Sequence, residues 1–145
     1  MTKQAVFASH RLVWSKIAKS GRLGVVMEDD LVFDDKIGQV LSAISQVKEK
    51  FDILRLNTSM QKCLFGPEIL LSQSLSVRPI FEPMADSGCY ALTADAAQNL
   101  LRMSASFCAH LDDFLFSPER RMSCLQLCPP RASQIIHIDE ISRAW

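Results

Sequence analysis

A run of three acidic residues follows a short apolar segment at residues 23–27. The acids are Glu28, Asp29 and Asp30, and another apolar run at residues 31–33 comes directly after them. Short runs rich in Val and Leu are typical of buried strands, and ligands of open α/β sheets gather at the carboxyl ends of strands. Adjacent carboxylates repel one another unless a cation or strong hydrogen-bond donors lie among them. The triplet therefore predicts a divalent-metal site that holds a phosphorylated ligand, with a solvated turn or a helix cap as the alternative.

The composition of the 145-residue chain is that of one globular domain, which we place at residues 1–145. Sixteen basic and sixteen acidic residues balance, so no overall field points to a nucleic acid or a membrane surface. The apolar runs are far shorter than the ~20 residues that span a bilayer, and the N-terminal residues lack the apolar core of a secretory signal. Five cysteines without Cys-x-x-Cys spacing fit buried thiols in a reducing cytosol. We expect a cytoplasmic protein.

Patterns of helices and strands alternate along the chain. Gly21 is expected to end the first helix, Asp34 or Asp35 to begin the second, and Thr93 to cap the third. The expected elements are a helix over 4–19, a strand ending at the acids, a helix over 37–51, a strand over 52–57, loops and short strands over 60–83, a strand over 88–92, a helix from residue 93, a short helix within 111–121 opened by Asp112 and Asp113, and a last strand over 123–128. This alternation predicts an α/β fold.

Five segments in this order resemble one known family. They are Ser9-His10 with Trp14, then Val25 to Asp30, Phe51 to Leu56, Gly88 to Ala97, and Leu111 to Leu115. They are similar to the "SH…W", "(I/L)LEDD", "(F/W)D-I-x-x-L", "YxIsxxgA" and "(P/V)D-x-F/Y-L" segments of glycosyltransferase family 25, bacterial lipooligosaccharide and lipopolysaccharide glycosyltransferases. Ordered matches of this kind are more specific than an acidic triplet alone.

The resemblance implies a GT-A-like nucleotide-sugar-binding fold, a Rossmann-like mixed sheet flanked by helices. It also implies inverting transfer of a hexose, galactose, from UDP-galactose to a lipooligosaccharide, LPS or other lipid-linked surface glycan, with Mn²⁺ or Mg²⁺ as cofactor. A cation held by carboxylates neutralises the charge that builds on a departing nucleoside diphosphate. Such an enzyme would work in the cytoplasm, with peripheral association at the inner face of the bacterial inner membrane.

Carried over to this chain, the acidic motif supplies most of the metal and donor site. Asp30 would be the first metal ligand, and Glu28 would contact both the metal and the nucleotide-sugar. Asp29 would help to position the sugar. His137 would complete the metal shell, or it would be an ordinary surface histidine, which is the stronger of the two alternatives. His10 matches the family's "SH" segment and would contact the donor or serve as a hydrogen-bonded packing residue.

The acceptor side needs a base, because inversion requires a proton to leave the acceptor hydroxyl. Asp112 matches the family's Asp and would be that base, with Asp113 directly behind it; the alternative is that Asp112 caps a helix. Asn57 and Asp86, at expected strand or loop ends, are candidates for sugar contacts.

The chain departs from the family pattern at its beginning, because the family's N-terminal part, which helps to hold the nucleotide base, is expected before the "SH" segment. We therefore interpret residues 1–145 as an N-terminally truncated, C-terminal portion of the family domain. Either it is a fragment, or another chain supplies the N-terminal half, and alone it should bind nucleotide-sugar poorly or not at all. Two alternatives remain: a catalytically inactive remnant or interaction module of the same fold, and a metal-dependent phosphoryl-transfer domain, which would usually show a Gly-rich phosphate loop.

Overall fold

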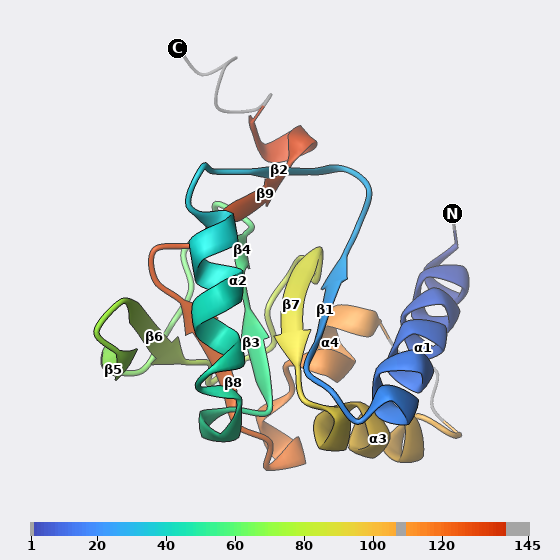
Figure 1. Ribbon diagram of the computed structural model, residues 1–145. Coiled ribbons are helices and arrows are strands. Elements are labelled where there is room, and N and C mark those ends of the chain that lie inside the picture. The colour runs from blue at the N-terminus through green and yellow to red at the C-terminus, as the bar shows by residue number, and fades with distance from the viewer. Residues whose placement is uncertain (1, 107–109, 139–145) are drawn as a thin grey trace.

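A computed structural model describes residues 2–106 and 110–138 of the chain. Within these residues six strands form a mixed sheet, which has helices on both faces (Figure 1). The order across the sheet is β1 (Gly24–Met27), β7 (Cys89–Leu92), β3 (Ile53–Arg55), β8 (Cys124–Leu127), β6 (Leu75–Pro79) and β5 (Ile69–Ser72). This confirms the expected α/β class, with a mixed sheet flanked by helices.

The sheet is mostly antiparallel, contrary to the usual α/β expectation of parallel strands. β7 runs antiparallel to both β1 and β3, and β6 is antiparallel to both β8 and β5, whereas β3 and β8 are parallel. β1, which precedes the acidic triplet, stands at one end of the strand order. The carboxyl end of β1 therefore meets the start of β7 rather than the end of a parallel neighbour.

A smaller sheet lies beyond one end of the large sheet (Figure 1). It consists of β2 (Leu31–Phe33), β9 (Ala132–Gln134) and β4 (Asn57–Thr58), with β9 between the other two. β9 was not expected from the sequence, because the segment is short and polar and depends on pairing with distant strands. Through this pairing the chain directly after the acidic triplet lies beside residues 132–134.

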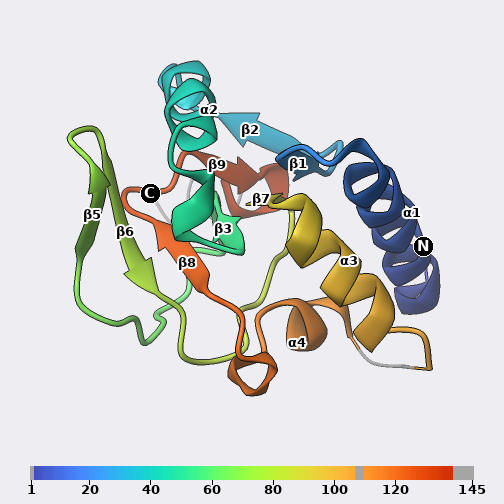
Figure 2. The ribbon, with the colours of Figure 1, turned by 60° about the horizontal axis from the view of Figure 1, so that its bottom comes forward.

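The two faces of the large sheet carry different helices (Figure 2). Helices α1 (Lys3–Ser20), α3 (Ala94–Met103) and α4 (Leu111–Leu115) share one hydrophobic core, and α2 (Ile37–Ser45) packs into the other. β7 contributes to both cores, because side chains alternate across a strand: Tyr90 lies in the first and Ala91 in the second. None of the helices in the described ranges is long and apolar enough to cross a membrane.

Two of the three predicted helix-end residues, Gly21 and Thr93, have the predicted role in the structure. Gly21, with φ 64°, ends α1, and the Thr93 hydroxyl caps α3 by accepting from the Ala96 N–H at 3.1 Å. The second helix is shorter than expected and has Lys36 at its N-cap, so the prediction of an aspartate cap is wrong there. Asp34 lies just before the helix, where one carboxylate oxygen accepts from the Lys36 N–H at 3.0 Å and the other pairs with Arg131 at 2.7 Å.

The described cysteines are free thiols, but the expectation of buried thiols holds only for Cys89 and Cys124, because Cys63 and Cys128 are partly exposed. Cys108 lies outside the described residues. Burial raises the pKa of Cys89 and of Cys124 to about 12. These two thiols therefore stay protonated at neutral pH and are unsuited to nucleophilic chemistry.

Candidate functional site

The acidic triplet forms the turn between β1 and β2. Glu28 is half-buried, whereas Asp29 and Asp30 are exposed. The turn is fixed through its backbone: the Glu28 N–H donates to the Gly88 carbonyl at 2.9 Å, and the Asp30 carbonyl accepts from the Ile135 N–H at 2.9 Å. The three acids thus have different surroundings, with one carboxylate directed inward and two toward solvent.

Glu28 is held by two side chains from distant parts of the chain. Nε2 of His10, on α1, lies 3.3 Å from one carboxylate oxygen, and Nε2 of Gln134, at the end of β9, donates to the other oxygen at 2.9 Å. The hydrogen bond from His10 lowers the pKa of Glu28 below its ordinary value, and its effect exceeds the opposing effect of burial. Glu28 is therefore a fixed carboxylate at neutral pH.

A cavity of about 370 Å³ opens beside Glu28. Its wall brings together residues from six separate segments, and the polar side chains in it include Glu28, Asp86, His110, Asp112, Gln134 and His137. Three residues that the sequence singled out, Glu28, Asp112 and His137, therefore share one cavity, as does the weaker candidate Asp86. Carboxylates, amides and imidazoles in one cavity are the groups that proteins use to bind polar ligands.

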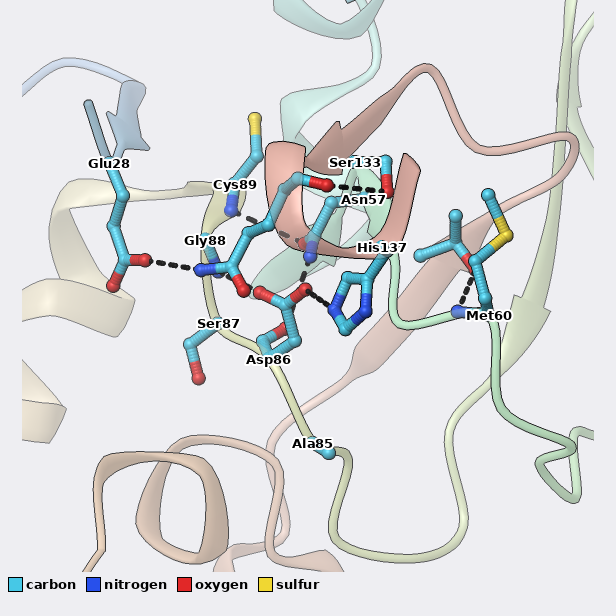
Figure 3. Close-up of polar contacts among 12 residues, drawn as sticks. Glu28, Asn57, Met60, Ala85, Asp86, Ser87, Gly88, Cys89, Ser133 and His137 are labelled. Atoms are coloured by element: carbon cyan, nitrogen blue, oxygen red, sulfur yellow. Dashed lines mark hydrogen bonds and ion pairs between the residues drawn. The ribbon is translucent and has the colours of Figure 1, made fainter. Parts of the chain in front are cut away.

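Asp86 occupies an unusual position in this wall. Its backbone is left-handed, with φ 70°, a conformation in which Asp is enriched among non-glycine residues. One carboxylate oxygen accepts from the Gly88 N–H at 3.0 Å, and the other lies 3.2 Å from Nε2 of His137 (Figure 3). Burial raises the pKa of Asp86, and this effect exceeds the opposing effects of its hydrogen bonds and of Arg55 and His137.

Asp112 holds the loop that carries Asp86. One of its oxygens accepts from the Asp86 N–H at 3.0 Å, and the other accepts from the Ser87 hydroxyl. The helix α4 begins at Leu111, with His110 as N-cap, so Asp112 does not cap this helix, which was the alternative to its role as a base. Asp113 is exposed and is not part of the cavity wall.

The same loop is held from behind by buried polar side chains. Arg55 donates to the carbonyls of Ala85 at 2.7 Å and of Asp86 at 3.1 Å. Asn57 is fully buried; its amide donates to the Asp86 carbonyl at 3.2 Å and accepts from the Cys89 N–H at 3.2 Å. Asn57 therefore supports the loop (Figure 3). It is not among the residues that line the cavity.

A second cavity, of about 520 Å³, lies between α1 and the end of β1. Val6, Val13 and Val26 contribute apolar wall, and His10 with the three acids contributes the polar wall. Glu28 borders both cavities, whereas Asp29 and Asp30 border this one. Two of the expected donor contacts, His10 and Asp29, thus line the same cavity, which His137 does not border.

The expected metal ligands do not form a ready-made set. Among the residues that the structure describes, no group of three or more His, Cys, Asp or Glu side chains is arranged to hold a metal ion. His137 is paired with Asp86 rather than with Asp30. The carboxylates of Asp29 and Asp30 are accessible, and Mg²⁺ is commonly bound by one or two carboxylates together with substrate phosphates.

The sequence profile of one family, Glycosyltransferase family 25 (LPS biosynthesis protein), matches residues 2–115. This span contains α1, the acidic turn, the Asp86 loop and α4. The chain belongs to glycosyltransferase family 25. No curated protein gives a significant match to it.

Several residues of this family 25 site were not expected. Gln134 lies beyond the matched residues, and its contact with Glu28 depends on the pairing of β9, so no local pattern indicated it. Trp14 and Tyr90 stand within the quoted motifs, which was the available signal, but their hydrogen bond at 2.8 Å joins residues 76 positions apart. Arg55 occupies an alternating strand pattern that gave no indication of a buried charge.

Proposed function

We propose that this family 25 domain transfers galactose, with inversion, from UDP-galactose to a lipooligosaccharide, LPS or related surface glycan. The observation that carries the proposal is the position of Glu28, a fixed carboxylate bordering two cavities that both contain further acids. One cavity would take the donor and the other the acceptor. A GT-A-type arrangement is part of this proposal, as is a cytoplasmic site of action at the inner membrane face.

The 520 Å³ cavity, between α1 and the end of β1, suits the donor better than the 370 Å³ cavity does. It combines apolar side chains with the exposed carboxylates of Asp29 and Asp30. A diphosphate next to these acids would be repelled unless a cation lay between them, so Mn²⁺ or Mg²⁺ is proposed as the cofactor. Asp29 and Asp30 would hold it together with the diphosphate oxygens, and it would neutralise the charge on the leaving group.

The 370 Å³ cavity would then take the acceptor sugar. Asp112 is the proposed base, because its carboxylate lines this cavity and has lone pairs beyond the two that the loop uses. Asp86 and His137 present further polar atoms to sugar hydroxyls. Asp113 is exposed outside this wall, so we assign it no proton transfer.

The test measures galactose transfer from UDP-galactose to a lipooligosaccharide acceptor with Mn²⁺, at millimolar donor because weak binding is expected. Asp112→Asn should lower the rate by about 10²-fold or more, the usual contribution of a general base. Asp95→Asn, which alters an exposed acid in the first turn of α3, is the matched control and should change the rate less than threefold. Failure of the unmodified protein both to bind donor and to transfer sugar would reject the proposal.

A second candidate is a catalytically inactive member of the same fold that serves as an interaction module. The observation that favours it is that Asp112 uses both oxygens to hold the loop at residues 86–87. In that case Asp112→Asn would lower the stability of the fold, and the unmodified protein would transfer no sugar.

A further inference from the structure

We propose that Trp14, Tyr90 and His10 form a directed hydrogen-bond chain that fixes the orientation of the Glu28 carboxylate. Trp14 and Tyr90 are then positioning residues for the site, although neither borders a cavity described above. The hydrogen-bond assignment stands on geometry alone. The consequence for donor binding rests on the function proposed above.

The donor-to-acceptor direction of the hydrogen-bond chain is fixed at Trp14, because its indole N–H can only donate. Its Nε1 atom lies 2.8 Å from the Tyr90 hydroxyl oxygen, so this oxygen is the acceptor. Tyr90 is completely buried, and its own O–H needs an acceptor. In the described part of the chain, the acceptor in reach is Nδ1 of His10, at 2.7 Å.

The hydrogen bond at Nδ1 of His10 also determines whether the other ring nitrogen, Nε2, carries a hydrogen. Because Nδ1 of His10 accepts the Tyr90 hydrogen, the ring hydrogen lies on Nε2, which faces a Glu28 oxygen at 3.3 Å. A hydrogen on Nδ1 would leave the buried Tyr90 hydroxyl without an acceptor. It would also turn the Nε2 lone pair toward a carboxylate, which is repulsive. Each contact thus favours the same tautomer.

The hydrogen-bond chain is anchored in the packed hydrophobic core. The rings of His10 and Tyr90 are stacked, with centroids 5.8 Å apart and planes inclined by 15°. Trp14 stacks on Phe114 at 6.0 Å. The relay therefore joins two rigid elements, α1 and β7, and leaves His10 little freedom to rotate. Glu28 receives an N–H from this relay on one oxygen and an N–H from Gln134 on the other.

Nitrogen NMR tests the assignment directly, because the ¹⁵N shifts of a histidine ring report which nitrogen carries the hydrogen. The chain has three histidines, and the His10 signals are identified as those lost in His10→Gln. We expect His10 to carry its hydrogen on Nε2. In Tyr90→Phe, which keeps the ring and removes the hydroxyl, only the Glu28 contact still selects this tautomer, so we expect a larger share of the Nδ1 form than in the unmodified protein. A His10 hydrogen on Nδ1 in the unmodified protein would overturn the inference.

Donor affinity tests the positioning role. Tyr90→Phe should weaken binding of UDP-galactose with Mn²⁺ about three- to tenfold, the range associated with loss of one neutral hydrogen bond. Ser104→Ala is the control, since it removes another buried hydroxyl that bridges to α1 through Arg11; it should change affinity less than twofold. In a His10→Gln background, where an amide can donate to Glu28 without Tyr90, adding Tyr90→Phe should have no further effect.

The outcomes separate this inference from the proposed function. If the unmodified protein binds no donor but His10 carries its hydrogen on Nε2, the proposed function fails and the hydrogen-bond chain stands. If the protein binds donor and Tyr90→Phe binds it equally well, Tyr90 has no positioning role and the inference fails while the proposed function stands.

Discussion

Gln134 donates a hydrogen bond to Glu28 across 2.9 Å, although 106 positions separate the two residues in the chain. The contact joins the end of β9 to the acidic turn after β1. With this contact both oxygens of the Glu28 carboxylate have a hydrogen-bond partner, because the other oxygen faces His10. The orientation of the acidic motif in this family 25 protein is therefore set by residues from both ends of the chain.

Gln134→Ala should release one oxygen of Glu28 and weaken UDP-galactose binding by about tenfold or more, as expected for one hydrogen bond to a carboxylate. Gln98→Ala, at an exposed position of α3, should leave binding unchanged. The measurement is a titration followed by amide chemical shifts. Equal affinity of the two variants would show that Gln134 does not position Glu28.

Arg55→Met should destabilise the protein by about 2–4 kcal/mol, because it leaves the Ala85 carbonyl and the buried Gln126 side-chain oxygen without the Arg55 donor and leaves the Asp86 carbonyl with Asn57 alone. Arg22→Met, at an exposed position, should stay within about 0.5 kcal/mol. Urea unfolding measures both free energies. A change below 0.5 kcal/mol in Arg55→Met would contradict the role assigned to this side chain.

Asp86→Asn should change the pH dependence of stability. Burial raises the pKa of Asp86 above its ordinary value of 3.8, so its charged form is disfavoured in the folded protein. The contribution of Asp86 to stability is thus fully present below pH 3.8 and is lost as the pH rises through its raised folded pKa. Asn keeps an acceptor for the Gly88 N–H and tolerates the left-handed backbone.

The free energy of unfolding of the unmodified protein, relative to Asp86→Asn, should therefore fall as the pH rises through this window. Denaturant unfolding at a series of pH values measures the difference. A difference that grows with pH would mean that the pairing with His137 outweighs the burial of the carboxylate.

Removal of divalent cations with EDTA should abolish galactose transfer, and Mn²⁺ should restore it. Asp30→Asn should raise the Mn²⁺ concentration needed for half-maximal restoration about tenfold, because a carboxylate ligand becomes a neutral amide. Asp35→Asn, an exposed acid outside both cavities, is the matched control. Full transfer after EDTA treatment would reject the cofactor.

Local chemistry predicted the parts of the fold that depend on neighbouring residues. The Thr93 cap, the end of α1 at Gly21 and the strand before Glu28 follow from patterns a few residues long. The antiparallel pairing of β7 with β1 and β3 depends on contacts across the whole chain, and the patterns that predicted an α/β fold do not specify strand direction.

The site was predictable to a similar degree. Glu28, Asp112 and His137 were singled out by residue type and family resemblance, and they share a cavity. Their partners were not predictable. Asp112 holds the Asp86 loop, and His137 pairs with Asp86, because the tertiary fold brings these segments together. Asn57 is a strand residue whose burial was not evident from its polar type.

The most direct test of the account is an amide chemical-shift titration of the unmodified protein and of Glu28→Gln with UDP-galactose and Mn²⁺. We predict shifts that centre on residues 28–30 and on His10, with at least tenfold weaker affinity in Glu28→Gln. The account would be contradicted by an unmodified protein that shows no shifts at millimolar donor, or by equal affinity in the two proteins.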